Sequence, residues 1–395
     1  MARTRSRILG AAVDALTSLK LTIVCLAALM VLVLACTLAQ VNMGTVGAVK
    51  AYIRSFVVWY DLPGSEYSIP VFPGGATVGL VLGANLVAAQ ARRLELSWKK
   101  AGLWIIHAGL ILLFVGEFMT GLFQVDTRLT IEEGQTVNYV ESPREYELAV
   151  VDVTDPTHDD VYGVPETLLT GDEVAVTGTP LVLKVKRYFR NAALSMRQPG
   201  DPPSPVTSGM GGGVTVRELA PVVSDDDVNR TAAMVEPVAG GRSYGSWLVS
   251  AGLGARQQFT HEGRTYVLAM RPKRTYLPYS LTLKKFSHDR YPGTDIPKNF
   301  SSLVTLENKA KGERREVLIY MNQPLRYDGK AFYQASFGKG DTLSILQVVE
   351  NPGWLLPYIS CVLVTLGLIV HFAIALRRGF RRGPEQQGRD AMEAV

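Results

Sequence analysis

The chain has 395 residues, of which 47% are hydrophobic and only 19% are charged, and its formal net charge is +5. Ordinary soluble proteins carry roughly 25% charged residues, so this chain is short of charge for its length. Such a composition excludes collagen, long disordered proteins and small disulfide scaffolds. It predicts a few membrane-spanning helices beside one sizeable water-facing domain.

Four apolar segments are long enough to cross a bilayer, which takes roughly 20 helical residues. They cover residues 16–40, 69–91, 101–123 and 354–376. The second segment is the weakest, because it is rich in glycine and contains two prolines near its start. A cleaved signal peptide is the alternative for the first segment. Its apolar core exceeds the usual length of about 7–15 residues, which favours an uncleaved anchor.

Lysine and arginine predict the orientation of these segments, because cytoplasmic loops carry an excess of both. Basic clusters occur in the N-terminal segment 1–15, in the short loop 92–100 and in the C-terminal segment 377–395. Four crossings place all three clusters, and both termini, in the cytoplasm. The basic balance is then a matter of topology, and a nucleic-acid-binding role is not expected.

Two regions are expected outside the membrane: a loop over residues 41–68 and a large domain over residues 124–353. The loop contains apolar residues at helical spacing over residues 46–60, which predicts a helix lying at the membrane interface. The alternative is a plain loop with aromatic anchors. The three cysteines lie within predicted spans, so the exported domain has no thiol for a disulfide or a thiolate metal site.

The large domain is expected to be rich in β-strands, because apolar and polar residues alternate between turn residues along most of its length. Two stretches, 129–153 and 259–286, share the order strand, glycine turn, strand, proline, strand, which suggests a duplicated β unit. Residues 197–213 have the composition of a mobile linker. The acidic run Asp225–Asp227 is interpreted as a solvated loop.

Two of the five histidines lie within predicted spans, where an ionisable side chain is a functional hypothesis by default. At a rise of about 1.5 Å per residue, His107 lies roughly 9–10 Å and His371 roughly 7–8 Å from the cytoplasmic boundary. Imidazoles at similar depth could share one metal or haem iron. The alternatives are a hydrogen bond between helices for His107 and an interfacial position for His371.

No soluble-type active site is visible in the sequence. The exported His158, His261 and His288 have no metal-ligand spacing and are expected to be surface or structural residues. Glu117, near the outer end of the third span, is interpreted as an interfacial carboxylate. The basic stretch RPKRTY with LKKF could receive haem propionates or a partner, but a solvated face is the favoured interpretation.

Several motifs nevertheless occur together in a recognisable order. The first span ends in CTLAQ, and His107 lies in HAGLILLFVG. The blocks FSHDRYPGTDIPKNFSSLVTL, MNQPLRYDGKAFYQASF and VVENPGWLLPYISCVLVTLGLIVHF follow. This combination resembles the ResB family of cytochrome c biogenesis proteins. The resemblance covers the four spans and residues 258–376, whereas residues 155–250 match little.

The resemblance implies a four-span subunit of cytochrome c maturation system II, in a bacterial inner membrane or a thylakoid. Such a subunit acts with a ResC/CcsA-type membrane partner and thiol-disulfide reductants to move haem b outward and attach it to CxxCH motifs of apocytochrome c. The family's third-span histidine, matched by His107, implies an axial haem ligand. The second ligand is either His371 or a group of the partner, and the family favours the partner.

The chain lacks a tryptophan-rich haem loop, so the resemblance implies a component of a holocytochrome c synthase complex that is not catalytic alone. Two other function classes remain open at the level of the sequence. One is a membrane-anchored sensor or assembly scaffold whose histidines are structural. The other is a dihaem-like electron carrier, which would need further pairs of ligands across the spans.

Overall fold

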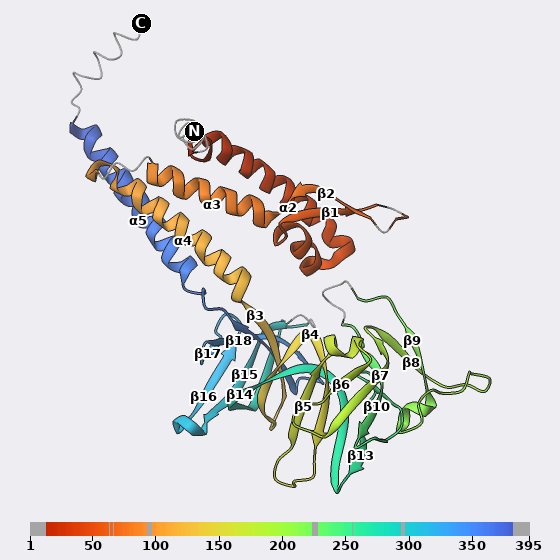
Figure 1. Cartoon of the computed structure of the whole chain (residues 1–395). Helices are drawn as coiled ribbons and strands as arrows, with labels where there is room; N and C mark the ends of the chain where they lie inside the picture. Colours follow the sequence, from red (N-terminus) through yellow and green to blue (C-terminus); the bar gives the residue numbers. More distant parts are fainter. Residues whose placement is uncertain are drawn as a thin grey trace. The chain divides into compact units, whose positions relative to one another are not determined.

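In a computed structural model the chain forms two compact units, one of residues 1–124 with 351–395 and one of residues 125–350. Figure 1 shows long helices in the first unit and mostly strands in the second. The N-terminal segment 1–12, the acidic run Asp225–Asp227 and the segment 382–395 lie outside the described residues. The described residues are 13–62, 64–65, 67–92, 97–222, 228–254, 256–293 and 297–381.

The first helix of the helical unit, α2 (Leu19–Ala48), begins at Ser18, whose hydroxyl accepts a hydrogen bond from the amide of Lys20. A side chain of this kind satisfies one of the amides that a helix start leaves without a partner. The helix is kinked at Gly44, which has a φ of 69°. A short π-helical stretch, η1 (Val49–Ile53), continues it.

The second helix, α3 (Gly75–Arg92), is joined to α2 by polar contacts. The buried side chain of Asn85 accepts a hydrogen bond from Thr22 and donates to the carbonyl oxygens of Leu16 and Ser18. Since these acceptors stand at the start of α2 and Asn85 lies in the second half of α3, the two helices are antiparallel.

Among the described residues, three helical segments are long and apolar enough to cross a membrane: Leu19–Ile53, Trp98–Phe123 and Leu356–Arg378. The segment Trp98–Phe123 contains helix α4 (Ala101–Phe123). The segment Leu356–Arg378 is part of helix α5 (Leu356–Arg381). They agree with three of the four predicted spans. Helix α3 is not among them, so the fourth crossing stays a prediction.

Two expectations for the helical unit are wrong in detail. The predicted span 69–91 does not begin as a helix, because Ser68–Pro73 is strand β2, paired with β1 (Val57–Asp61). Prolines disfavour helical backbone at the preceding residue, which explains the late start of α3 at Gly75. The predicted interfacial helix over 46–60 is helical only as far as Ile53, because the following residues enter β1.

The second unit is rich in β-strands, as expected. Its largest sheet has ten strands in the order β16-β15-β14-β4-β3-β19-β18-β17, with β13 on β14 and β5 on β4. Their bounds are β3 Val125–Glu132, β4 Thr136–Asp152, β5 Asp160–Pro165, β13 Gln257–His261, β14 Arg264–Arg290, β15 Pro297–Asn308, β16 Glu313–Tyr320, β17 Leu325–Tyr327, β18 Lys330–Gly338 and β19 Leu343–Glu350.

A second sheet has five strands in the order β11-β10-β7-β6, with β12 on β10, and β8 and β9 form a separate pair. Short 3₁₀ helices η3 (Glu166–Thr170), η4 (Met210–Gly213) and η5 (Lys309–Lys311) connect strands. The strand bounds are β6 Glu173–Ala175, β7 Leu181–Phe189, β8 Ala192–Met196, β9 Val214–Glu218, β10 Ala232–Ala239, β11 Arg242–Ser243 and β12 Trp247–Ser250.

Strands β4 and β14 are long and antiparallel, and each contributes to two separate hydrophobic cores. The end of β4, with Leu148, and the start of β14, with Tyr266, line one core together with β7 and β10. The start of β4, with Val137, and the end of β14, with Leu283, line the other core together with β15 and β19. The two stretches suggested as copies are thus paired neighbours, while their duplication stays a prediction.

The segment 197–213 connects β8 to β9 and is not a free linker. Val206 within it is buried against Leu248 and Phe189, and the guanidinium of Arg197 donates to the carbonyl oxygen of Asp201. The expectation of a mobile linker rested on glycine and proline content alone, which does not reveal a buried valine.

Candidate functional site

Helices α4 and α5 pack backbone to backbone along a stripe of glycines in α4. Gly102, Gly109 and Gly116 are buried and recur every seven residues. A Cβ added at Gly102 would lie 2.5 Å from the backbone nitrogen of His371, and one at Gly109 would lie 2.8 Å from Val364 Cγ2. The earlier glycine faces the later residue of α5, so the two helices are antiparallel. Small residues are what allow such close approach in membrane helix pairs.

Two polar contacts strengthen this pair of helices. The buried hydroxyl of Ser360 in α5 donates to the carbonyl oxygen of Gly109 at 2.5 Å. At the other end, Asn351 donates to Thr120 Oγ1 at 3.0 Å and accepts from the amide of Gly353 at 2.8 Å. Asn351 and Gly353 belong to the sequence NPGW, but the spacing of these residues alone does not predict their contacts with α4.

The imidazole of His107 is partly buried on α4 and is oriented by the helix itself. Its Nδ1 lies 2.7 Å from the carbonyl oxygen of Leu103, one turn earlier. Because a carbonyl oxygen only accepts, Nδ1 carries the proton and Nε2 keeps its lone pair. This is the tautomer in which a histidine binds a metal through Nε2 while its other ring nitrogen donates to a backbone carbonyl. The side chain therefore fits the role of an axial ligand to haem iron.

His371 does not lie at the level of His107. Its backbone lies against Gly102, and its ring makes an edge-on contact with Phe372 at 5.7 Å between centroids. His107 is five residues further along α4 than Gly102, about 7.5 Å along the axis and roughly 140° around it from the glycine stripe. Among the contacts of the described residues, none joins the two imidazoles.

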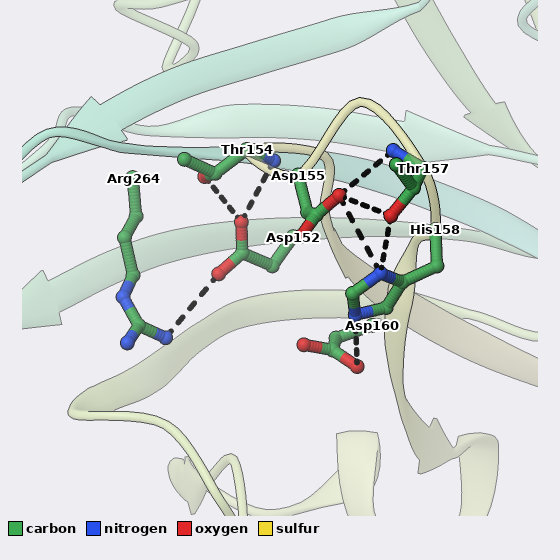
Figure 2. A network of polar contacts seen from close by, with 7 residues as sticks. All are labelled: Asp152, Thr154, Asp155, Thr157, His158, Asp160 and Arg264. Carbon is green, nitrogen blue, oxygen red and sulfur yellow. Dashed lines mark hydrogen bonds and ion pairs between the residues drawn. The ribbon is translucent and has the colours of Figure 1, made fainter.

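The histidines of the strand-rich unit occupy three different environments. His261 is buried on the β13–β14 hairpin, with Nδ1 2.6 Å from the hydroxyl of Tyr244. His158 is exposed on the β4–β5 loop, where Nδ1 lies 3.1 Å from Thr157 Oγ1 and 3.5 Å from Asp155, as Figure 2 shows. His288 is buried, with Nδ1 3.0 Å from Asp341 and Phe337 packed on its ring at 4.3 Å between centroids. Among the described residues, no group of three or more His, Cys, Asp and Glu side chains could hold a metal ion.

The basic stretch RPKRTY in the middle of β14 is paired with carboxylates of β4. Arg271 donates to Glu147 at 2.9 Å and both side chains are largely buried. Further along, Lys273 pairs with Glu145, and Arg274 pairs with Glu141. Because these cations are already paired, they do not form a free receptor for haem propionates. Glu117, in α4, is exposed.

Comparison with known proteins gives a local match in the strand-rich unit. A model of the ResB-like family matches residues 231–345, which run from the start of β10 into β19. Protein NrfI of Wolinella succinogenes is 36% identical over 102 residues, which make up 26% of this chain and 11% of that protein. The predicted resemblance to the ResB family is confirmed.

The ResB-like match supports a role in cytochrome c biogenesis. It covers β10 to β18 and the start of β19, and it begins at residue 231, inside the stretch 155–250 for which the sequence motifs predict little resemblance. It contains neither α4 nor α5, so His107 and His371 lie outside it.

Proposed function

We propose that the ResB-like chain handles haem b during cytochrome c maturation, as the subunit that works beside a ResC/CcsA-type membrane protein. In this proposal His107 binds the iron of haem in transit, and the strand-rich unit lies on the extracytoplasmic side, where it meets the partner or apocytochrome c. Both termini are cytoplasmic, and α3 completes four crossings. Covalent attachment belongs to the complex and not to this chain alone.

The observation that carries this proposal is that only one of the two ring nitrogens of His107 is engaged by the described residues. A histidine inside an apolar helix is costly unless its polar nitrogens are used. Leu103 accepts the proton of Nδ1, whereas no contact within the described part of the chain involves Nε2. Haem is a suitable cargo for such a site, because its macrocycle is apolar and its iron takes an imidazole ligand.

The packing of α4 on α5 supports the same assignment. The glycine stripe and the Ser360 hydrogen bond hold α4 against α5 on one face, and His107 lies on a different face. That face is free of α5, so a second ligand is most simply supplied by the partner protein. His371 would have to leave its place opposite Gly102 to reach the same iron.

The proposal is tested by co-expressing the chain with a ResC/CcsA-type partner in a host that lacks its own maturation system. Covalent haem on a reporter cytochrome with a CxxCH motif is the readout. His107→Ala is expected to lower haem attachment at least tenfold, and added imidazole is expected to restore part of it. Gly121→Ala, on the same helix with no atom within 4 Å of the added Cβ, is the matched control.

Normal maturation by His107→Ala, at wild-type amounts of membrane protein, would refute the ligand assignment. The second ligand is tested by absorption spectra of the purified complex. A low-spin bis-histidine spectrum that survives His371→Ala supports a ligand from the partner. Loss of that spectrum in His371→Ala assigns the second ligand to α5 instead.

A further inference from the structure

A hollow of about 480 Å³ lies in the strand-rich unit, away from the ion pairs along the middle of β4 and β14. One wall is the turn between β6 and β7, with Gly178, Thr179 and Pro180. The other is the β13–β14 hairpin, with His261, Glu262, Arg264 and Tyr266. We call it the Tyr266 pocket. Residues from segments some eighty positions apart in the sequence meet there.

The hydroxyl of Tyr266 has no acceptor for its proton among the described residues, although the guanidinium of Arg264 lies beside it. The residue is fully buried. Its ring is fixed by stacking on Phe259, at 5.7 Å between centroids. Burial, followed by the nearby carboxylate of Asp152, raises the pKa of Tyr266, so the hydroxyl keeps its proton. A buried polar group without a partner costs stability, and a ligand in the pocket would remove that cost.

A second donor is His261, which is also buried. Its Nδ1 lies 2.6 Å from the hydroxyl of Tyr244, and the carboxylate of Glu262 lies 3.9 Å from its Nε2. The Glu262 carboxylate favours the proton on Nε2, with Tyr244 donating to Nδ1. The ring lines the pocket, with its Nε2 beside the carboxylate of Glu262.

Arg264 supplies the charge. One of its guanidinium nitrogens lies 3.4 Å from Asp152 Oδ2, and the side chain is 60% exposed. Figure 2 shows that the other oxygen of Asp152 accepts from the amide and the hydroxyl of Thr154. Asp152 is thus held by Thr154 and Arg264. The guanidinium of Arg264 also interacts with the hydroxyl of Tyr266, and since it carries five N–H groups, further donors are left for another acceptor.

Two carboxylates lie at or near the pocket, Asp152 and Glu262, and neither blocks the binding of an anionic ligand. Asp152 is occupied as described, and Glu262 is 84% exposed on the hairpin turn, where its φ of 48° holds it at the edge. Arg264, Tyr266 and His261 therefore line one pocket, in which the exposed carboxylate of Glu262 is the group that competes for their N–H and O–H donors. Arginine binds carboxylates through charge-assisted and often bidentate hydrogen bonds, so Arg264 is the main anchor for such a ligand.

We propose that the Tyr266 pocket binds a carboxylate through Arg264, Tyr266 and His261. Two sources of carboxylate fit a protein of cytochrome c maturation: a haem propionate, or an acidic side chain of a polypeptide. The choice between these sources rests on the function proposed above, whereas the pocket itself does not. Tyr266 and Arg264 both lie within the ResB-like segment.

The test uses the full chain in detergent and iron-free protoporphyrin IX as the probe, with its dimethyl ester as the control ligand. Without iron the probe does not depend on ligation by His107, so this experiment and the haem-attachment assay fail independently. The free acid is expected to bind at least tenfold more tightly than the ester. Tyr266→Phe removes only the hydroxyl and is expected to weaken binding of the free acid about fivefold or more, with no change for the ester.

Arg264→Gln is also expected to weaken binding of the free acid and not of the ester, by a larger factor than Tyr266→Phe. Arg187→Gln, which removes another exposed, ion-paired arginine, is the matched control. A second arm replaces porphyrin with a capped peptide that contains two glutamates, against the same peptide with glutamines. If Tyr266→Phe weakens binding of the glutamate peptide but not of the porphyrin, the carboxylate comes from a polypeptide. If both variants bind both acidic probes as the wild type does, the pocket holds only water and the proposal is overturned.

Discussion

Replacing Gly102 by alanine should separate α4 from α5. The added Cβ would lie 2.5 Å from the backbone nitrogen and 2.6 Å from the Cα of His371. Ordinary contacts between such atoms lie near 3.5–4.0 Å, so α5 must retreat by about 1 Å. Both obstacles are backbone atoms, and no change of rotamer can relieve the overlap. Overpacking of this kind costs about 1–3 kcal/mol.

Gly121→Ala is the control, because it lies on the same helix and its added Cβ meets nothing within 4 Å. Alanine favours helix over glycine by about 1 kcal/mol at both positions, so this gain cancels in the comparison. The assay is unfolding of the purified full chain in mixed micelles, followed by helical circular dichroism. Gly102→Ala should be less stable than Gly121→Ala by about 1–3 kcal/mol. Equal stability of the two variants would refute the close backbone contact.

Two further predictions concern the strand-rich unit. Glu147→Gln leaves the largely buried guanidinium of Arg271 without its counter-ion, and should destabilise the unit by about 3 kcal/mol or more in thermal unfolding. Lys284→Gln, which breaks an exposed pair with Glu316, should cost less than about 1 kcal/mol, and similar losses in both variants would contradict the role of burial. Burial would raise the pKa of Asp152, but its bonds to Thr154 and the charge of Arg264 outweigh burial and hold the pKa below the usual 3.8. The unfolded chain then takes up this proton first, so the stabilisation is present above the usual pKa and is lost as the pH falls through the lower value of the folded state. Asp152→Asn should accordingly show a flatter stability profile than the wild type between about pH 5 and pH 2, and parallel profiles would exclude this contribution.

The sequence was sufficient to predict the broad architecture. Long apolar runs predicted α2, α4 and α5, because a helix in lipid satisfies its own backbone and needs only length and hydropathy. Alternating residues predicted a β-rich domain between α4 and α5. These signals are local, so one segment at a time reveals them.

What the sequence could not show depends on contacts between distant segments. Pairing Arg271 with Glu147 requires the register of β14 on β4, across more than a hundred residues. The depths of His107 and His371 were counted from the ends of their spans, whereas the glycines of α4 determine the actual register. The Tyr266 pocket could not be predicted from histidine spacing, because its walls come from separate hairpins.

The sharing of β4 and β14 by two cores has a mechanical consequence for the strand-rich unit. Because each core needs residues from both strands, unfolding of β4 and β14 around one core would also remove two strands from the other core. The unit should therefore respond to heat or force as a single cooperative body. A destabilising substitution in β5–β7, which lie outside the ResB-like segment, should therefore also destabilise the strands inside that segment, because β4 and β14 belong to both cores.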